Sequence, residues 1–262
     1  MNRSLSRLAL VAAAALAAAS GSAQDLAAIK QSGHLRVLAV AVPEGPRFIT
    51  ATAGEGFDGE ILAGFARLQG LTVEMVTVES WDALIPALLK GRGDLIAGGF
   101  TDTPARRGQI EFTQEVFPTR DVVITRKPTP AVTTVDQLKK MQVGVIKGTS
   151  MAEALAEAGV SKVEATLAPG GVPAALRDKK VAAAVDGLEA ALVASQHDPD
   201  LQIGLFLGSA QSLAYGVRKD SGQLLTALNE YLGNVRKSVA WSRMVVKYFG
   251  PSAPEILRRA RE

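Results

Sequence analysis

The sequence has 262 residues, 47% of them hydrophobic, and a formal net charge of +3. This length is enough for one or two α/β domains, each with its own hydrophobic core. The basic residues are scattered along the chain, which argues against a nucleic-acid partner. The sequence contains no cysteine, which excludes a disulfide, a thiolate nucleophile, a cysteine metal site and a lipid-modified cysteine.

The beginning of the chain is typical of a signal peptide. Arg3 and Arg7 accompany an apolar run, Leu8 to Ala19, that is short for a membrane span, and small residues follow it. The alternative is an uncleaved membrane anchor. We expect residues 1–23 to be a signal peptide, cleaved after Ala23, and the rest of the chain to be exported to the periplasm without a lipid anchor.

Apolar runs then alternate with amphipathic segments. The continuous apolar run from Leu35 to Val42 predicts a buried parallel strand, and residues 71–78 predict a half-buried one. Residues 58–69 and 81–90 carry apolar side chains at helical spacing. The resulting β-α-β-α-β order up to residue 97 predicts a parallel sheet with helical crossovers.

A second β/α series begins with a predicted strand at residues 121–126. Its remaining strands are expected at residues 141–146, 163–166, 181–185 and 203–207, and its helices at residues 135–140, 151–158, 172–179 and 188–196. A last strand at 214–218 and a helical tail follow. This order predicts a discontinuous first lobe, residues 24–119 plus 214–262, and an inserted second lobe, residues 120–213.

The segment from Gly98 to Arg107 has the strongest local signal. Thr103 is a favourable N-cap and Pro104 a favourable first helical residue. The turn before them would direct backbone N–H groups outward beside a guanidinium, which is an arrangement suited to a carboxylate. The alternative is a capped helix with two surface arginines, Arg106 and Arg107.

Ligands of open parallel sheets bind beyond the carboxyl ends of the strands. The residues in those positions are a loop with Glu44, Arg47 and Phe48, the turn just described, a Lys147–Ser150 turn, and Asp186. Together they offer donors for a carboxylate and an acceptor for an ammonium group, which are the partners that an α-amino acid needs.

Each of these residues also has a purely structural interpretation. Ser150 can form a capping box with Glu153, and Asp186 can cap the helix that follows it. Trp81 can pack in the core at a helix start. Phe48 follows a proline-rich loop, where we expect it to be too exposed for an ordinary core residue, either as a lid contact or as a local staple.

Known catalytic patterns are missing from the sequence. It has no HExxH zinc motif, no Walker A loop and no GxSxG elbow, and no pair of carboxylates stands out as an acid–base couple. His34 and His197 lie in polar turns without a pattern of metal or nucleophile partners. We therefore predict a protein that is not an enzyme and that holds no cofactor or metal.

Several segments, in their order and spacing, resemble the extracellular solute-binding proteins of family 3, which serve polar amino-acid ABC transporters. The most specific is the Thr-x-Thr-Pro-x-Arg segment at residues 101–106, and the resemblance runs from about Leu35 to Gly250. The other carrying segments are Leu35–Val37, Gly56–Asp58, Ser80–Leu88, Val143–Ser150 and Val217–Lys219.

This resemblance implies an α/β, two-lobed periplasmic-binding-protein fold of type II, with two parallel-rich sheets joined by a two-strand hinge near residues 118–120 and 211–213. It also implies that the protein captures an amino acid or a related small zwitterion for an ABC permease, with a monomer as the default state. The implied ligand-binding residues are Phe48, Trp81, Gly99, Thr101, Arg106, Ser150 and Asp186.

Within that set, the resemblance assigns a separate role to each kind of residue. Arg106 would bind the ligand carboxylate in a forked geometry, and Asp186 would accept hydrogen bonds from the ammonium group. Gly99, Thr101 and Ser150 would add further contacts, and the aromatic rings of Phe48 and Trp81 would enclose the ligand side chain.

The sequence also departs from the family pattern. The run from Ala39 to Phe48 lacks an aspartate that often faces the ligand side chain, which makes a basic amino acid less expected, and the second hinge segment reads Leu213-Ala214. Two alternatives stay open. One is a periplasmic enzyme resembling cyclohexadienyl dehydratase, with Glu44 or Glu189 as general acid. The other is a binding protein that serves as a sensor or as an accessory to an exported oxidoreductase.

Overall fold

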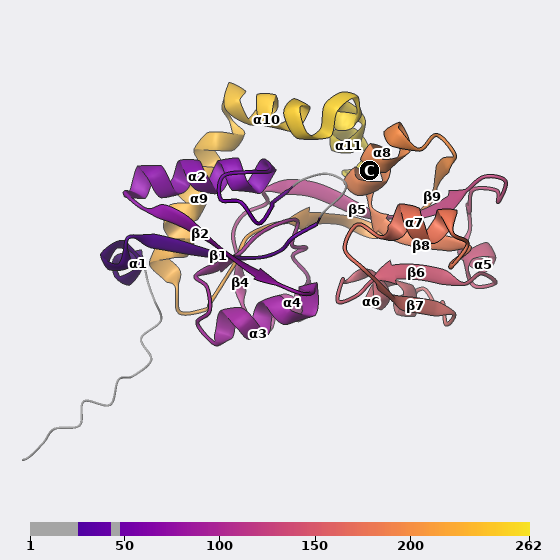
Figure 1. Cartoon of the computed structure of the whole chain (residues 1–262), viewed down its shortest axis with the longest axis horizontal. Helices are drawn as coiled ribbons and strands as arrows, with labels where there is room; N and C mark the ends of the chain where they lie inside the picture. Colours follow the sequence, from indigo (N-terminus) through magenta and orange to yellow (C-terminus); the bar gives the residue numbers. More distant parts are fainter. Residues whose placement is uncertain (1–25, 43–47) are drawn as a thin grey trace, which may run out of the picture.

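The computed structural model describes residues 26–42 and 48–262, which form two sheets with helices on both sides of each (Figure 1). The expected signal peptide, Glu44 and Arg47 lie outside the described residues. Within the described ranges, none of the helices is long and apolar enough to cross a membrane. The first described element is the short helix α1 (Leu26–Ser32), which contacts the first sheet.

The first sheet has the strand order β2-β1-β3-β10-β4. β1 pairs in parallel with β2 and β3, whereas β10 runs antiparallel to β3 and β4. The predicted apolar run of β1 is buried because helices cover both faces, with α2 (Phe57–Gln69) packed against β2 and α3 (Leu84–Leu89) against β1 and β3. The strands are β1 (His34–Val40), β2 (Thr72–Val78), β3 (Leu95–Ile96), β4 (Glu111–Phe112) and β10 (Gly216–Val217).

The second sheet has the order β7-β6-β8-β5-β9 and the same mixture of pairings. β6 lies parallel to β7 and β8, and β5 lies antiparallel to β8 and β9. Its strands are β5 (Phe117–Arg126), β6 (Val143–Ile146), β7 (Val163–Leu167), β8 (Ala183–Gly187) and β9 (Leu201–Leu213). Its helices are α5 (Val135–Leu138), α6 (Met151–Glu157), α7 (Val172–Arg177) and α8 (Leu188–His197).

Two strands are longer than predicted. β5 begins at Phe117 instead of residue 121, and β9 continues to Leu213 instead of ending at residue 207. The added residues pair with each other, Phe117 with Leu213 and Thr119 with Gln211, so each extension depends on a partner about 90 positions away that local patterning does not reveal. These paired extensions coincide with the predicted hinge segments.

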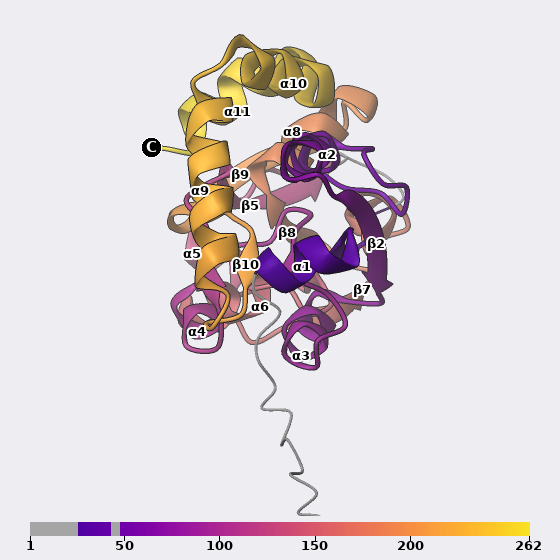
Figure 2. The same ribbon diagram turned by 90° about the vertical axis from the view of Figure 1, so that its left-hand side faces the viewer.

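The C-terminal helices follow β10 and stand on one side of the molecule (Figure 2). They are α9 (Gly222–Arg236), α10 (Val239–Phe249), the short 3-10 helix η2 (Gly250–Ser252) and α11 (Ala253–Arg259). α9 and α10 pack against α2 of the first sheet, whereas η2 and α11 contact α8 of the second. The tail therefore touches both halves of the fold.

Candidate functional site

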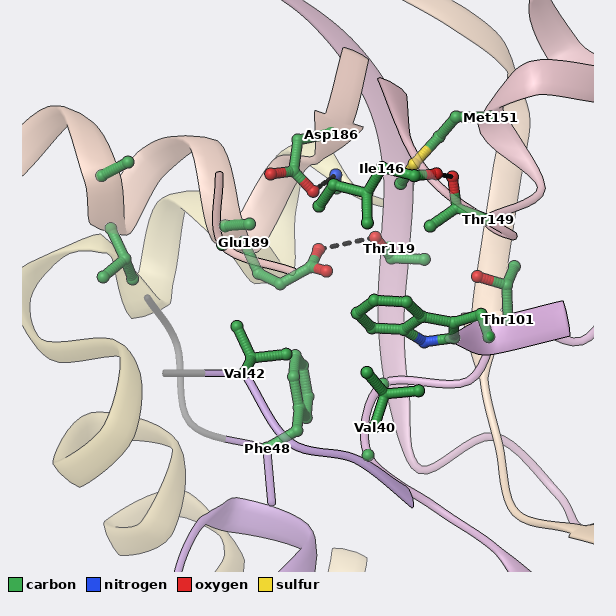
Figure 3. Close-up of a pocket in the computed structure, with 18 of the residues that line it drawn as sticks. Val40, Val42, Phe48, Thr101, Thr119, Ile146, Thr149, Met151, Asp186 and Glu189 are labelled. Carbon is green, nitrogen blue, oxygen red and sulfur yellow. Dashed lines mark hydrogen bonds between the residues drawn. The ribbon is translucent and has the colours of Figure 1, made fainter. Parts of the chain in front are cut away.

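A cavity of about 600 Å³ lies between the two sheets and is lined by residues from both. All seven predicted site residues line it, although they are spread over about 140 positions of the sequence. In the close-up, Val40, Val42, Phe48 and Thr101 of the first sheet's half face Asp186 and Glu189 of the second (Figure 3). The segments that we expected beyond the carboxyl ends of the strands therefore meet at one cavity.

Arg106 belongs to α4 (Pro104–Arg107), whose start is as predicted. Pro104 is its first residue, and the Thr103 hydroxyl accepts a hydrogen bond of 3.3 Å from the backbone N–H of Arg106. The guanidinium of Arg106 lies 4.0 Å from the centre of the Phe100 ring, and its Nη1 donates a 2.7 Å hydrogen bond to the Thr101 carbonyl. This group is thereby positioned in the wall of the cavity.

The two adjacent arginines differ in environment. Burial lowers the pKa of Arg106 to about 10, so this side chain remains positively charged at neutral pH. Arg107 points to the surface instead, where its Nη2 lies 2.5 Å from the Asp102 carboxylate. Only Arg106 of this pair lines the cavity, so the alternative of two surface arginines is wrong for Arg106 and correct for Arg107.

The Gly98–Gly99 turn is held by a residue for which the sequence suggested no role, Asp58 of α2. Its Oδ2 accepts hydrogen bonds from the N–H of Gly98 (2.9 Å) and of Gly99 (3.3 Å), and its Oδ1 accepts one of 3.2 Å from the Tyr215 hydroxyl. Both glycines have positive φ, 97° and 74°, which favours glycine here. The N–H of Gly99 is directed at Asp58, so any contact of Gly99 with a ligand involves its other atoms.

Phe48 is buried, contrary to the expectation of an exposed loop residue. It is 8% exposed and packs among Phe57, Phe117 and Phe249, with ring centres 6.1, 5.9 and 5.4 Å away. The sequence could not show this because the three partners come from α2, β5 and α10. Phe48 still contributes to the cavity wall, together with Trp81 of the short 3-10 helix η1 (Trp81–Ala83).

Ser150 lines the cavity but does not form the predicted capping box. It has helical φ and ψ, −68° and −12°, and its hydroxyl caps none of the described backbone groups of α6. A capping box forms instead at Thr134 and Gln137 of α5. Next to Ser150, the Thr149 hydroxyl donates a 2.9 Å hydrogen bond to the Ile146 carbonyl. The Ser150 hydroxyl therefore stays available on the cavity side.

Three carboxyl groups face the cavity from the second sheet: Asp121 of β5, Asp186 of β8 and Glu189 of α8. Asp186 accepts a 2.9 Å hydrogen bond from the Gly187 N–H. Glu189, 6% exposed, accepts one of 2.6 Å from the Thr119 hydroxyl (Figure 3). Asp121, 2% exposed, accepts a long one of 3.4 Å from the Gln211 amide.

The pKa values of these carboxyl groups are raised, to about 6 for Asp121 and about 7 for both Asp186 and Glu189. The main cause is burial, which disfavours the charged form. Mutual repulsion adds to it, because the charge of Asp121 raises the pKa of both other groups. Hydrogen bonding opposes the shift in each case, and so does the positive charge of Arg106 for Asp121.

The electrostatic asymmetry of the cavity suits a zwitterion. A guanidinium on the first sheet's half can bind a carboxylate, and carboxyl groups on the other half can accept hydrogen bonds from an ammonium group. Asp121 was missed by sequence reasoning, although an acid directly before the apolar run Val122–Ile124 could have signalled it. Among the described residues, no three His, Asp or Glu side chains are arranged to hold a metal ion.

This fold and this cavity define a two-lobed solute-binding protein. The chain belongs to the bacterial extracellular solute-binding proteins, family 3, whose model matches residues 40–251. It has the type II periplasmic-binding-protein fold of that family. Its two sheets are mixed, where we predicted parallel-rich ones, because β5, β9 and β10 run antiparallel to their neighbours.

Curated relatives include binding proteins and enzymes. The lysine/arginine/ornithine-binding periplasmic protein of Escherichia coli (strain K12) is 29% identical over 215 residues, which cover 74% of this chain and 78% of that protein. The membrane-bound lytic murein transglycosylase F of Desulfosudis oleivorans is 25% identical over 234 residues, 87% of this chain. The match covers only 51% of that enzyme's length.

Among solved structures, the P235GK mutant of ArgBP from T. maritima superimposes with a TM-score of 0.77 at 26% identity, covering 86% of this chain and 98% of that one. An ancestral arginine-binding protein bound to arginine gives a TM-score of 0.73, also at 26% identity, over 83% of this chain and 99% of its own.

Proposed function

We propose that the protein captures a cationic amino acid in the periplasm and delivers it to an ABC permease of the inner membrane. The observation that carries this proposal is the composition of the cavity, in which the Arg106 guanidinium stands opposite three carboxyl groups, two of them buried (Asp121 and Glu189) and one half-buried (Asp186). Relatives named for binding lysine, arginine, ornithine or histidine support it.

Two of the charged residues bind the α-carboxylate and the ammonium group of the ligand, which together form its head group. Its carboxylate binds Arg106, whose forked guanidinium suits bidentate contact, with the backbone and hydroxyl of Thr101 beside it. Its ammonium group donates to Asp186, and the Ser150 hydroxyl adds a contact from the start of α6. Phe48 and Trp81 enclose the side chain.

The other two acids of the cavity favour a ligand that carries a second positive charge in its side chain. Asp121 and Glu189 are left over once the head group is bound, and with a neutral ligand Glu189 would have no cationic partner and Asp121 would share the charge of Arg106 with the ligand carboxylate. In this proposal, these two acids supply the negative charge that the Ala39–Phe48 run lacks. For this reason we now favour a basic amino acid, which the sequence alone made less expected.

Ligand capture would act through closure of two lobes, residues 24–119 plus 214–262 and residues 120–213. Because Arg106 and Asp186 lie on different lobes, a zwitterion bridges them and stabilises the closed state by its greater affinity for that state. The protein would reach the periplasm by cleavage of residues 1–23 and work as a monomer.

A thermal-shift screen of amino acids tests the proposal. Arginine, lysine and ornithine at about a hundredfold over their dissociation constants should each add about 2.7 kcal/mol to the free energy of unfolding. Glutamine and glutamate at the same concentration serve as controls of similar size. An equal shift with glutamine would contradict the role of the second charge, and no shift with any amino acid would contradict the proposed function as a whole.

Glu189 gives one observation in favour of the enzyme alternative. A buried carboxylic acid with a pKa of about 7 retains its proton in a large fraction of molecules at neutral pH, as a general acid for a leaving hydroxyl requires. Turnover of prephenate or arogenate that is lost in Glu189→Gln would establish this activity. In a pure binding protein, the same variant would weaken arginine binding and there would be no turnover to lose.

A further inference from the structure

The last helix, α11, lies beyond the part of the chain that the family model describes. The match to the family ends at residue 251, and α11 begins at Ala253. α10, which precedes it, packs on α2 of the first lobe, and the chain turns at Gly250 before α11 reaches α8 of the second lobe (Figure 1). This crossing is additional to the two hinge strands.

On the second lobe, α11 and η2 contact both α8 and β9. The Gln196 amide of α8 donates a hydrogen bond to the Ser252 hydroxyl. The Arg259 guanidinium lies 4.7 Å from the centre of the Phe206 ring of β9. The same ring is 4.6 Å from the guanidinium of Arg120, which belongs to the hinge part of β5. Arg259 therefore packs beside the hinge itself.

On either side of α11, the tail is anchored in the first lobe. Phe249, the last residue of α10, stacks on Phe117 at the start of β5 with ring centres 4.5 Å apart. After α11, the Arg261 guanidinium lies 2.7 Å from the Glu115 carboxylate. Glu115 in turn accepts a 2.8 Å hydrogen bond from the Ser212 hydroxyl at the end of β9. Ionic and aromatic contacts thus fix the tail on both sides of the hinge.

The described conformation also brings the two lobes together at the rim of the cavity. Gly148 of the second lobe lies so close to Asp82 of the first that a Cβ added to the glycine would be 2.6 Å from the Asp82 backbone nitrogen. The contacts of α11 with α8 and β9 therefore exist in a conformation in which the lobes touch, and separating the lobes changes the distances that these contacts span.

We propose that residues 250–262 form a strap, a third connection between the lobes that favours the closed conformation before ligand binds. The Arg259–Phe206 contact and the Gln196–Ser252 hydrogen bond are its attachments to the second lobe. A strap of this kind raises affinity for every ligand of the cavity, because the measured dissociation constant falls as the fraction of binding-competent molecules rises.

Small-angle X-ray scattering of the ligand-free protein tests the strap without reference to any ligand. Arg259→Ala combined with Gln196→Ala should increase the radius of gyration towards that of an open form. Arg258→Ala is the matched control, because Arg258 lies on the same helix with a 63% exposed side chain that pairs with Glu262. An unchanged radius of gyration in the double variant would overturn the proposal.

A cross-link provides the reverse test. The chain has no cysteine, so Gln196→Cys with Ser252→Cys introduces one unique pair that a short bifunctional thiol reagent can join. The cross-linked protein should stay compact without ligand, whereas an increase in its radius of gyration to that of the double alanine variant would overturn the strap. If arginine binds, its dissociation constant should rise about three- to tenfold in the double alanine variant.

Discussion

The hydroxyl of Thr119 donates a 2.6 Å hydrogen bond to the carboxyl group of Glu189, and both side chains are buried. Thr119 belongs to the hinge part of β5, and Glu189 is the second residue of α8. One hydrogen bond therefore connects a strand that must deform during closure with an acid of the binding cavity. If a ligand cation binds at Glu189, as we propose, this bond transmits its effect to the predicted hinge.

Thr119→Val should raise the pKa of Glu189, because the hydroxyl stabilises its ionised form. The free energy of unfolding should also fall by about 1 to 3 kcal/mol, since the variant leaves a buried carboxyl group with fewer partners. Urea denaturation at pH 7 measures the loss. Thr119→Ser retains the hydroxyl and should keep most of the wild-type free energy of unfolding. Equal losses of stability in both variants would show that the packing of the Thr119 side chain, not its hydrogen bond, stabilises the protein.

Arg106→Ala should weaken binding of the carboxylate-containing ligand by about a hundredfold, because a charged bidentate contact is lost. Isothermal titration calorimetry with arginine measures this change. Arg107→Ala is the control, since Arg107 pairs with Asp102 at the surface and does not line the cavity. Similar losses in the two variants would contradict the assignment of the carboxylate to Arg106.

The raised pKa values of the cavity acids predict a pH dependence of stability. Asp121, Asp186 and Glu189 bind protons more tightly in the folded than in the unfolded state. Their contribution to the free energy of unfolding is therefore fully present below pH 4 and is lost as the pH rises through 6 to 7. For Asp121 alone the loss between pH 5 and pH 8 is about 1 kcal/mol.

Burial also raises the pKa of Asp58 to about 6, so the contribution of the cavity acids is identified by comparing a variant with the wild type. The pKa of Glu115 is lowered, because Ser212 and two arginines outweigh the effect of burial, so its contribution is lost only at acidic pH. Melting temperatures of the ligand-free protein between pH 5 and pH 8 should fall less in Asp121→Asn than in the wild type. A cationic ligand favours the ionised acids, so its stabilising effect should be larger at pH 8 than at pH 5.

Asp58→Asn should destabilise the protein by about 1 to 3 kcal/mol, because the amide cannot accept all three hydrogen bonds from Gly98, Gly99 and Tyr215. Chemical denaturation measures the effect. Tyr215→Phe removes only one of the three bonds and should cost less. A larger loss in Tyr215→Phe would mean that the Tyr215 hydroxyl, not the bonds from the Asp58 carboxylate to the two glycines, is the main stabilising group here.

Most of the order of strands and helices was predictable because most strands of the two β/α series are short apolar or alternating runs bounded by turn residues, whereas the two-residue strand β4 is too short to give such a signal. The cap of α4 at Thr103 was predictable for the same reason, since its partners are within three residues. The burial of Phe48 and the roles of Asp58 and Asp121 escaped prediction because the environment of these residues comes from distant segments. Burial among aromatic rings, a bond to a glycine turn and proximity to two other acids are properties of the assembled fold.

The position of β10 has a consequence for the order in which the two halves of this chain can fold. β10 lies between β3 and β4 in the first sheet, yet it consists of residues 216–217. The second sheet is built from one uninterrupted stretch, from Phe117 to Leu213. In a chain that crosses the membrane with its N-terminus first, the second lobe can therefore complete its sheet while the first still lacks the strand that joins β3 to β4, so the half that begins the sequence is the last to be finished.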